Sequence, residues 1–316
     1  MNDGKPKEAA EVPTLAALWA RFMDGYARAN GEKPNTTATR ERIWKKHLEP
    51  AFGAERPDAI TTESVQRLKG RLSALSAKSV NCVLTNLRRC LAVAVEWNVI
   101  PAMPYRIRLL KSAKPIVSFY EEPEYERLVE AAAETDPRTH VAVLLAGDAG
   151  LRLGEELGAE WPDVDLQRRL LKVRRAVSDD GTVTVPKGGK ARIAPTTSRL
   201  RDALAKHRHL RGDRVMTDEE GRGLDKWSLK WLVDVAEWRA GPRQGGRVHI
   251  LRHTFCSRLA ARNGPLIAIK ELAAHRALET TMRYMHLSAA APKETIRSLK
   301  VRGDVGGDDG GRGWRG

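Results

Sequence analysis

The sequence predicts a mainly α fold with a small antiparallel β-sheet, divided between two domains. Apolar residues recur at three- and four-residue intervals along most of the chain, which is the period of an amphipathic helix. Short strand-like stretches occur together between residues 170 and 194. A length of 316 residues with 41% hydrophobic residues is enough for about two hydrophobic cores.

The N-terminal part is predicted to be a helical bundle over residues 12–104, preceded by a flexible segment at 1–11. Thr14 is placed to cap the first helix, because a hydroxyl at that position can accept a hydrogen bond from the first turn. The other helices each have an apolar stripe on one side. We expect one carrying Ile43 to Leu48, one following Thr61 and Thr62, and one from about Lys78 to Trp97.

A linker is expected over residues 105–117, because Pro101 and Pro104 break helices and the basic residues that follow favour solvent. The second domain is expected over 118–301. Its first helix starts near three glutamates at 121–124, which suit the positive end of a helix. The tail at 302–316 has seven glycines in fifteen residues and is expected to be disordered.

Inside the second domain, the hydrophobic period changes after the helical stretch at 141–146. Residues 170–177, 182–185 and 191–194 are predicted to be short strands. The last two flank a turn containing Gly188 and Gly189, which predicts a hairpin between them. Helical patterns resume at Leu200.

The composition excludes several classes of protein and favours a nucleic-acid partner. No apolar run approaches the roughly 18 to 20 residues of a membrane span, and the polar start lacks the apolar region of a signal peptide, so we expect a cytoplasmic protein. The three cysteines show no C-x-x-C spacing, which predicts neither a disulfide framework nor a zinc site. The net charge of +15 points to a polyanion.

The positive charge is concentrated in the first 117 residues, which hold 20 basic and 11 acidic residues. Between Ser64 and Val95 there are six basic residues and no acidic one. Helices with such a run can bind phosphates, although a solvated helix face explains the pattern equally well. The candidate DNA-binding residues are Arg67, Lys69, Arg71, Lys78, Arg88 and Arg89.

Three separated segments carry side chains suited to phosphodiester chemistry. In the first, Gly150 precedes Arg152, and Glu155 lies three residues further on, where it can orient the guanidinium. In the second, Lys187 occupies the tip of the predicted hairpin. In the third, two histidines, an arginine and a tyrosine follow one another as His249-x-x-Arg252, His275 and Tyr284.

These residue types together can cleave a phosphodiester. Two arginines can bind the non-bridging oxygens of a phosphate and neutralise the charge of its transition state. A phenol can attack phosphorus, a lysine can protonate the leaving oxygen, and imidazoles can bind the phosphate or accept the phenolic proton. No carboxylate cluster is placed for two Mg²⁺ ions, so neither a metal nor another cofactor is expected.

This combination of motifs resembles the tyrosine recombinases, or phage-type integrases. The resemblance implies that Tyr284 is the nucleophile, Arg152 and Arg252 bind the phosphate, and His249 and His275 support it. It also implies that Glu155 supports the first arginine and that Lys187 is the general acid for the 5′ hydroxyl. Lys190 is the rival for that role, and His253 and His286 are assigned structural roles.

The resemblance also implies the architecture and the reaction. Residues 12–104 would form a helical core-binding domain, and residues 118–301 the catalytic domain. The enzyme would cut and rejoin duplex DNA through a 3′-phosphotyrosyl intermediate, without metal or ATP. Its partners would be double-stranded DNA with inverted half-sites, further copies of the chain in a tetramer on that DNA, and an accessory DNA-bending protein.

Three alternatives remain open at this stage, and one residue departs from the family pattern. The alternatives are a type IB topoisomerase, a DNA-binding relative without catalysis and, more weakly, a basic RNA-binding protein, since aromatic residues are only 5% of the chain. Ala274 stands where the family usually has glycine, before His275. If that position needs a positive φ, alanine would be strained there and could displace His275.

Overall fold

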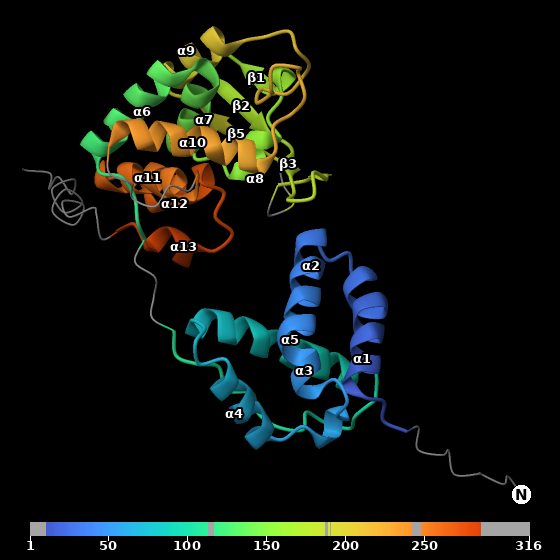
Figure 1. Cartoon of the computed structure of the whole chain (residues 1–316). Helices are drawn as coiled ribbons and strands as arrows, with labels where there is room; N and C mark the ends of the chain where they lie inside the picture. Colours follow the sequence, from blue (N-terminus) through green and yellow to red (C-terminus); the bar gives the residue numbers. More distant parts are fainter. Residues whose placement is uncertain (1–10, 113–116, 187–188, 190, 242–247, 286–316) are drawn as a thin grey trace, which may run out of the picture. The chain divides into compact units, whose positions relative to one another are not determined.

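The structure is a computed structural model, which describes residues 11–112, 117–186, 189, 191–241 and 248–285 (Figure 1). The chain divides into two compact units, Met1–Pro115 and Ile116–Gly316. The tail expected at 302–316 and nearly all of the flexible segment expected at 1–11 lie outside the described residues. In the described part of the chain, no helix has the length and apolar character needed to cross a membrane.

The first unit is entirely helical in its described regular elements. The predicted cap is present, because the Thr14 hydroxyl accepts from the amide of Ala17 at 3.3 Å. The Thr61 hydroxyl likewise accepts from the amide of Ser64 at 3.2 Å. The apolar stripes of these helices form one core. The elements are α1 (Leu15–Phe22), a π-helical segment η1 (Met23–Arg28), α2 (Pro34–Ile43), a π-helical segment η2 (Trp44–Leu48), α3 (Glu49–Phe52), a 3₁₀ turn η3 (Pro57–Ala59), α4 (Thr62–Arg71) and α5 (Ala77–Glu96).

The segment expected to begin the linker packs against the first unit instead of standing free. Ile107 is buried in the core of this unit. The amide of Leu110 donates to Asn81 Oδ1 on α5 at 2.7 Å, and Lys69 Nζ on α4 donates to the carbonyl of Arg108 at 2.7 Å. This contact is difficult to predict from the sequence, because the stretch is basic and Ile107 is the one strongly buried side chain in its described part.

The second unit contains eight helices and five short strands in its described residues. Glu121 caps the first helix, and its side chain and that of Glu124 form the reciprocal capping contacts expected at a helix start. The elements are α6 (Glu122–Thr135), α7 (Pro137–Gly147), α8 (Leu153–Leu157), a 3₁₀ turn η4 (Trp161–Asp163), β1 (Val164–Asp165), β2 (Leu170–Val173), β3 (Ala176–Val177), β4 (Val183–Thr184), β5 (Arg192–Pro195), α9 (Ser198–His207), α10 (Lys226–Ala240), α11 (Val248–Ala261), α12 (Leu266–Leu272) and α13 (Leu278–Met282).

The predicted hairpin between the last two strands is wrong. The predicted first strand divides into β2 and β3, and these two strands take different partners. β5 pairs antiparallel with β2 in the order β1-β2-β5, whereas β4 pairs with β3 in a separate two-stranded sheet. The backbone of β3 packs closely on α8, where a Cβ on Gly154 would lie 2.6 Å from the carbonyl oxygen of Val177. β3 is therefore packed on α8 and paired with β4, and not with β5.

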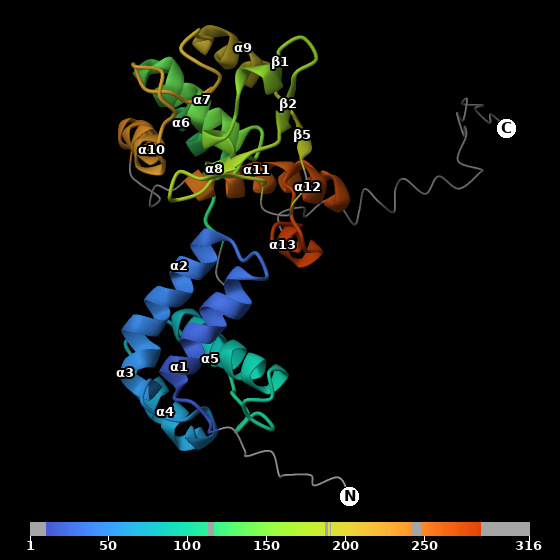
Figure 2. The same ribbon diagram turned by 90° about the vertical axis from the view of Figure 1, so that its right-hand side faces the viewer.

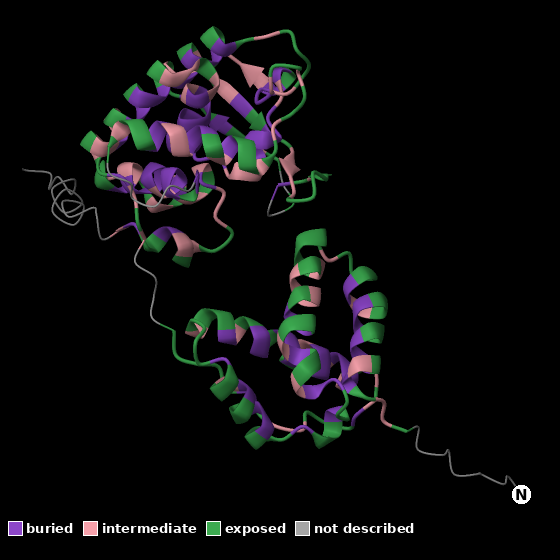
Figure 3. Ribbon diagram, in the orientation of Figure 1, coloured by how far each residue is buried: buried purple, intermediate pink, exposed green. Residues whose placement is uncertain are grey.

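Helix α7 forms the centre of the second unit and is buried along most of its length (Figure 3). It packs against α6, α9, α10 and α11, which explains why its residues 141–147 are all apolar. The two views show α11 and α12 together at one end of this unit, with α13 beyond them (Figures 1 and 2). The predicted fold class, mainly α with a small antiparallel sheet, is confirmed.

Candidate active site

The first candidate arginine, Arg152, follows a tight turn and precedes α8. Gly150 makes this turn with φ +63°, and a Cβ there would lie 2.5 Å from the ring of Phe255 on α11, so the position requires glycine. Arg152 Nη1 donates to Glu155 Oε1 at 2.7 Å, and Nη2 donates to the carbonyl of Ala274 at 2.7 Å. The guanidinium is therefore held from two sides.

The second candidate arginine, Arg252, lies on α11 and is 5% exposed. Its Nη1 donates to the carbonyl of Gly150 and its Nη2 to the carbonyl of Ala273. Arg152 and Arg252 are a hundred residues apart in the sequence, yet both bind the backbone of the turn at 273–274. This turn brings the two guanidinium groups into one site.

Glu155 is clamped by two arginines, and the second of them could not be identified from the sequence. Arg192 on β5 donates through Nη2 to Glu155 Oε2 at 2.9 Å. Burial raises the pKa of Glu155, but the hydrogen bond from Arg192 and the charges of Arg192 and Arg152 outweigh burial and lower it. Arg192 lies 37 residues after its partner, and no local spacing rule could have connected them.

Ala274, which stands where the family usually has glycine, adopts a backbone conformation that favours glycine. Its φ is +46°, in the left-handed region that costs an L-residue free energy. His275 nevertheless lies beside the candidate nucleophile, with its ring nearly parallel to that of Tyr284 and the ring centroids 6.2 Å apart. Its Nδ1 also makes a hydrogen bond of 2.9 Å with the hydroxyl of Thr281 on α13.

Tyr284 follows α13 and is 2% exposed. Its hydroxyl lies 2.5 Å from Nδ1 of His253, and it also makes a hydrogen bond with Cys256. Both contacts come from α11, and Cys256 is one helical turn from Arg252. The phenolic oxygen therefore lies against the helix that carries the second arginine.

The family resemblance implies only a structural role for His253, whereas its imidazole contacts the phenol of Tyr284. A sequence signal was present: His249 and His253 are four residues apart, so a helix presents them on one side. Their rings are 5.9 Å apart in an edge-to-face arrangement. His249 itself is exposed in the first turn of α11.

Burial among positive charges keeps the imidazoles of His253 and His275 neutral. Burial, followed by the charges of Arg252 and Arg152, lowers the pKa of His275 to about 4. Burial, then His249 and Arg252, lowers the pKa of His253 to about 4. Burial raises the pKa of the Tyr284 phenol, so its oxygen carries a proton at neutral pH.

The structure thus brings together Arg152, Glu155, Arg252, His275 and Tyr284 from separate segments of the second unit. Lys187, its rival Lys190 and His286 lie outside the described residues. Across the described ranges, no group of three or more histidine, cysteine, aspartate or glutamate side chains is arranged to hold a metal ion.

The candidate DNA-binding residues lie on α4 and α5 of the first unit, and four of them are exposed. Arg67, Arg71, Lys78 and Arg88 have exposed side chains. Lys69 and Arg89 are partly buried, since Lys69 binds the carbonyl of Arg108 and the guanidinium of Arg89 lies over the ring of Tyr26 at 4.6 Å.

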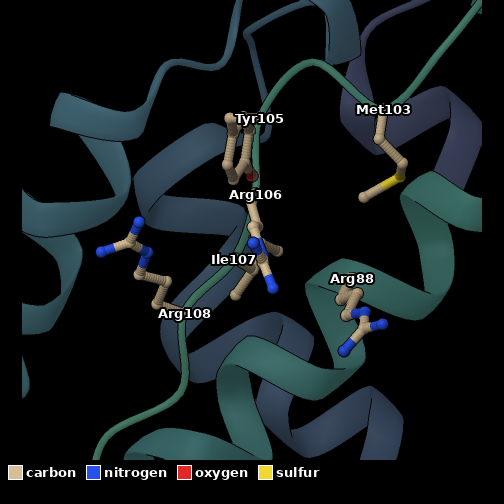
Figure 4. A pocket seen from close by; sticks show the side chains of 6 residues that line it. All are labelled: Arg88, Met103, Tyr105, Arg106, Ile107 and Arg108. Carbon is tan, nitrogen blue, oxygen red and sulfur yellow. The ribbon is translucent and has the colours of Figure 1, made fainter.

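A hollow of about 720 Å³ adjoins this basic surface, with Arg88 on one side of it. In Figure 4 the side chain of Arg106 lies between Arg88 of α5 and Arg108. Met103, Tyr105 and Ile107 complete the lining. The hollow therefore combines three guanidinium groups with apolar walls.

Comparison with known proteins places these observations in a family. The model of the phage integrase family matches residues 118–291, which is more than half of the chain. Tyrosine recombinase XerA of Pyrococcus furiosus is 25% identical over 289 residues, covering 90% of this chain and 94% of that protein.

Two solved structures show the same fold. The Tn1549 transposon integrase in complex with transposon right end DNA has a TM-score of 0.77 at 20% identity, covering 91% of this chain and 99% of that one. A lambda integrase tetramer bound to a Holliday junction has a TM-score of 0.68 at 18% identity, covering 88% of this chain and 83% of that one. The resemblance seen in the motifs is confirmed, and the chain belongs to the phage integrase family of tyrosine recombinases.

Proposed function

We propose that this protein is a site-specific DNA recombinase that cuts and rejoins duplex DNA through a covalent bond to Tyr284. The family match supports the reaction class, and XerA, named a tyrosine recombinase, is similar over nearly its whole length. The observation that carries the assignment of the nucleophile is the contact of the Tyr284 hydroxyl with His253 and Cys256 of α11, the helix that also carries Arg252.

The arginines supply the charge that a phosphoryl transfer requires. A guanidinium has five N–H donors. Among the described residues, Arg152 uses two on Glu155 and Ala274, and Arg252 uses two on Gly150 and Ala273. The fixed contacts set the orientation of each group, and the remaining donors bind the non-bridging oxygens of the scissile phosphate. The charge of the pentavalent transition state is then stabilised without a metal ion.

Tyr284 attacks phosphorus, forms a 3′-phosphotyrosyl bond and releases a 5′ hydroxyl. Lys187 protonates that leaving oxygen, and His249 and His275 bind the phosphate. Because the covalent bond retains the energy of the phosphodiester, a 5′ hydroxyl from a second strand can reverse the step and reseal the DNA without ATP.

The DNA partner is a duplex with inverted half-sites, bound by four copies of the chain. The tetrameric lambda integrase on a Holliday junction has the same fold, which supports such an assembly here. The exposed basic residues of α4 and α5 bind phosphates of the duplex and set its register. An accessory DNA-bending protein assists the assembly.

A nicked suicide substrate tests this proposal, because the released 5′ fragment diffuses away and the covalent complex accumulates. Wild-type protein is expected to form a complex with DNA that survives SDS, with or without EDTA. Tyr284→Phe is expected to bind the same DNA and form no covalent complex. A covalent complex with Tyr284→Phe excludes Tyr284 as the nucleophile, and DNA binding without cleavage by the wild type indicates a relative that has lost catalysis.

A strand-joining assay with two labelled duplexes separates recombination from topoisomerase activity. A recombinase joins the cut strand to a strand from another duplex carrying the same half-sites, whereas a type IB topoisomerase reseals the original strand. Joined products from two labelled duplexes are expected here. Relaxation of supercoiled DNA without any such product supports the topoisomerase instead.

A further inference from the structure

The contact between His253 and Tyr284 bears on a step that the family motifs leave open, namely which group accepts the phenolic proton of Tyr284. A phenol is a poor nucleophile until it loses its proton, and burial raises the pKa of the Tyr284 hydroxyl further. An acceptor within hydrogen-bonding distance of the phenolic oxygen is therefore needed when the bond to phosphorus forms.

We propose that His253 is a further catalytic residue, whose Nδ1 accepts the phenolic proton of Tyr284 during attack on the phosphate. This inference rests on the proposed function, in which Tyr284 is the nucleophile. The Nδ1 atom lies 2.5 Å from the hydroxyl oxygen, so the two atoms are in hydrogen-bond contact.

The other imidazoles of the site are placed differently. The ring of His275 is nearly parallel to that of Tyr284, with an angle of 9° between their planes, and its Nδ1 binds the hydroxyl of Thr281. His249 is exposed, and its ring neighbours that of His253. Within the described part of the chain, His253 is the imidazole that makes a hydrogen bond with the phenolic oxygen.

The protonation states suit a donor–acceptor pair. The phenol carries its proton at neutral pH and donates it, and the neutral imidazole of His253 accepts through Nδ1. In the attack, the bond from the phenolic oxygen to phosphorus forms, the bond from phosphorus to the 5′ oxygen breaks, and the phenolic proton moves to Nδ1. The general acid proposed above protonates the 5′ oxygen. In religation His253 returns the proton to the departing phenolate.

The charges around His253 explain how a weak base becomes effective when DNA is bound. His249, Arg252 and Arg283 all face it and lower its pKa, after the larger effect of burial. Arg252 and Arg283 also face the phenol, together with Cys256. A bound phosphate, and the further negative charge of its transition state, offset the charge of the arginines. The imidazole becomes more basic as the reaction proceeds.

The first measurement is the single-turnover rate of covalent complex formation on the suicide substrate. His253→Ala and His253→Asn are expected to react about 10²- to 10⁴-fold more slowly than wild type, which is the usual contribution of a general base. His140→Gln is the matched control, since His140 is a partly buried histidine on α7, remote from these residues in the sequence, and its rate is expected to equal that of wild type.

The second measurement separates proton transfer from a structural effect. The wild-type rate is expected to level off above the pKa of the imidazole in the DNA complex, whereas the His253→Ala rate continues to rise with pH because solvent must take the proton. Added imidazole is expected to raise the His253→Ala rate and to leave Tyr284→Phe inactive. Rescue compares rates within one variant, so a loss of stability cannot produce it.

Three outcomes each overturn a separate part of the proposal. His253 variants that react as fast as wild type, or faster, show that the contact only restrains Tyr284 in the free protein. A reduced rate with an unchanged pH profile and no imidazole rescue shows that His253 has a structural role. If Tyr284→Phe still forms the covalent complex, the proposed nucleophile fails, independently of His253.

Discussion

The guanidinium of Arg152 donates through Nη2 to the carbonyl oxygen of Ala274, and the two atoms are 2.7 Å apart. The neighbouring carbonyl, that of Ala273, accepts from Arg252. One backbone turn therefore holds both candidate phosphate-binding arginines, and the next residue along the chain is His275. The conformation of this turn, with its left-handed alanine, is a determinant of the whole site.

Ala274→Gly is expected to stabilise the protein while preserving cleavage. Glycine adopts a φ of +46° without the steric cost that alanine has there, so we expect the free energy of unfolding to rise by up to about 1 kcal/mol. Ala273→Gly is the matched control, because Ala273 has φ −77° and is fully buried. It should lower stability by about 1 kcal/mol. Thermal unfolding of the two variants measures both effects, and a loss of stability in Ala274→Gly contradicts the strain.

Arg192→Gln is expected to lower both stability and cleavage by disturbing Glu155. Removing one arginine from this buried carboxylate leaves an underpaired charge, which costs about 3 kcal/mol or more. Glu155→Gln combined with Arg192→Gln should cost less than the sum of the single changes, because they share one interaction. Denaturant unfolding and adduct formation test this. Additive effects would show that the two residues act independently.

Lys187→Ala is expected to cleave poorly on normal DNA and well on a substrate with a 5′-bridging phosphorothiolate. Sulfur leaves without protonation, so such a substrate no longer needs the general acid. Lys190→Ala is the matched control and should cleave both substrates alike. Adduct formation on the two substrates gives the answer, and rescue of Lys190→Ala in place of Lys187→Ala would reverse the assignment.

Glu156 is expected to make the free energy of unfolding fall as pH rises. It is fully buried on α8, no described residue donates a hydrogen bond to either carboxyl oxygen, and burial raises its pKa well above the usual value. The folded protein therefore holds a proton that the unfolded chain releases above its pKa of about 4.3, so this contribution decreases with pH by up to about 1.4 kcal/mol per unit.

Glu156→Gln removes this ionisable group with little change in volume. The variant is expected to be more stable than wild type at mildly alkaline pH, with the difference shrinking towards acidic pH. Denaturant unfolding at several pH values measures it. A difference that stays constant with pH would mean that Glu156 is charged in the folded protein.

The exposed basic residues of α4 and α5 are expected to contribute to DNA affinity by binding phosphates. Replacing Arg71 or Arg88 with glutamine should weaken binding to specific and unrelated duplexes alike. Each replacement should also reduce the slope of log affinity against log salt by roughly 0.9, the value for one neutralised phosphate. Arg222→Gln is the control, since Arg222 is also exposed but pairs with Asp218 on the second unit. If the Arg71 and Arg88 variants have the same salt slope as wild type, these residues only form a solvated helix face and do not bind phosphates.

The helices and the reactive residues could be predicted from the sequence because both depend on local order. Helical period and capping residues act within a few positions, and they placed the starts of α4 and α6 and both ends of α5 close to where they are observed. The motifs around Arg152, Arg252 and Tyr284 each combine suitable chemistry with short spacing.

The tertiary structure decides which of these segments come into contact. β5 pairs with β2 and not with β4, Arg192 reaches Glu155, and His253 reaches Tyr284 31 residues later in the chain. Each of these contacts depends on how buried elements pack, and no local period or propensity encodes it. The sequence by itself therefore determines which reactive side chains this protein has, whereas the packing of its elements determines which groups each of them contacts.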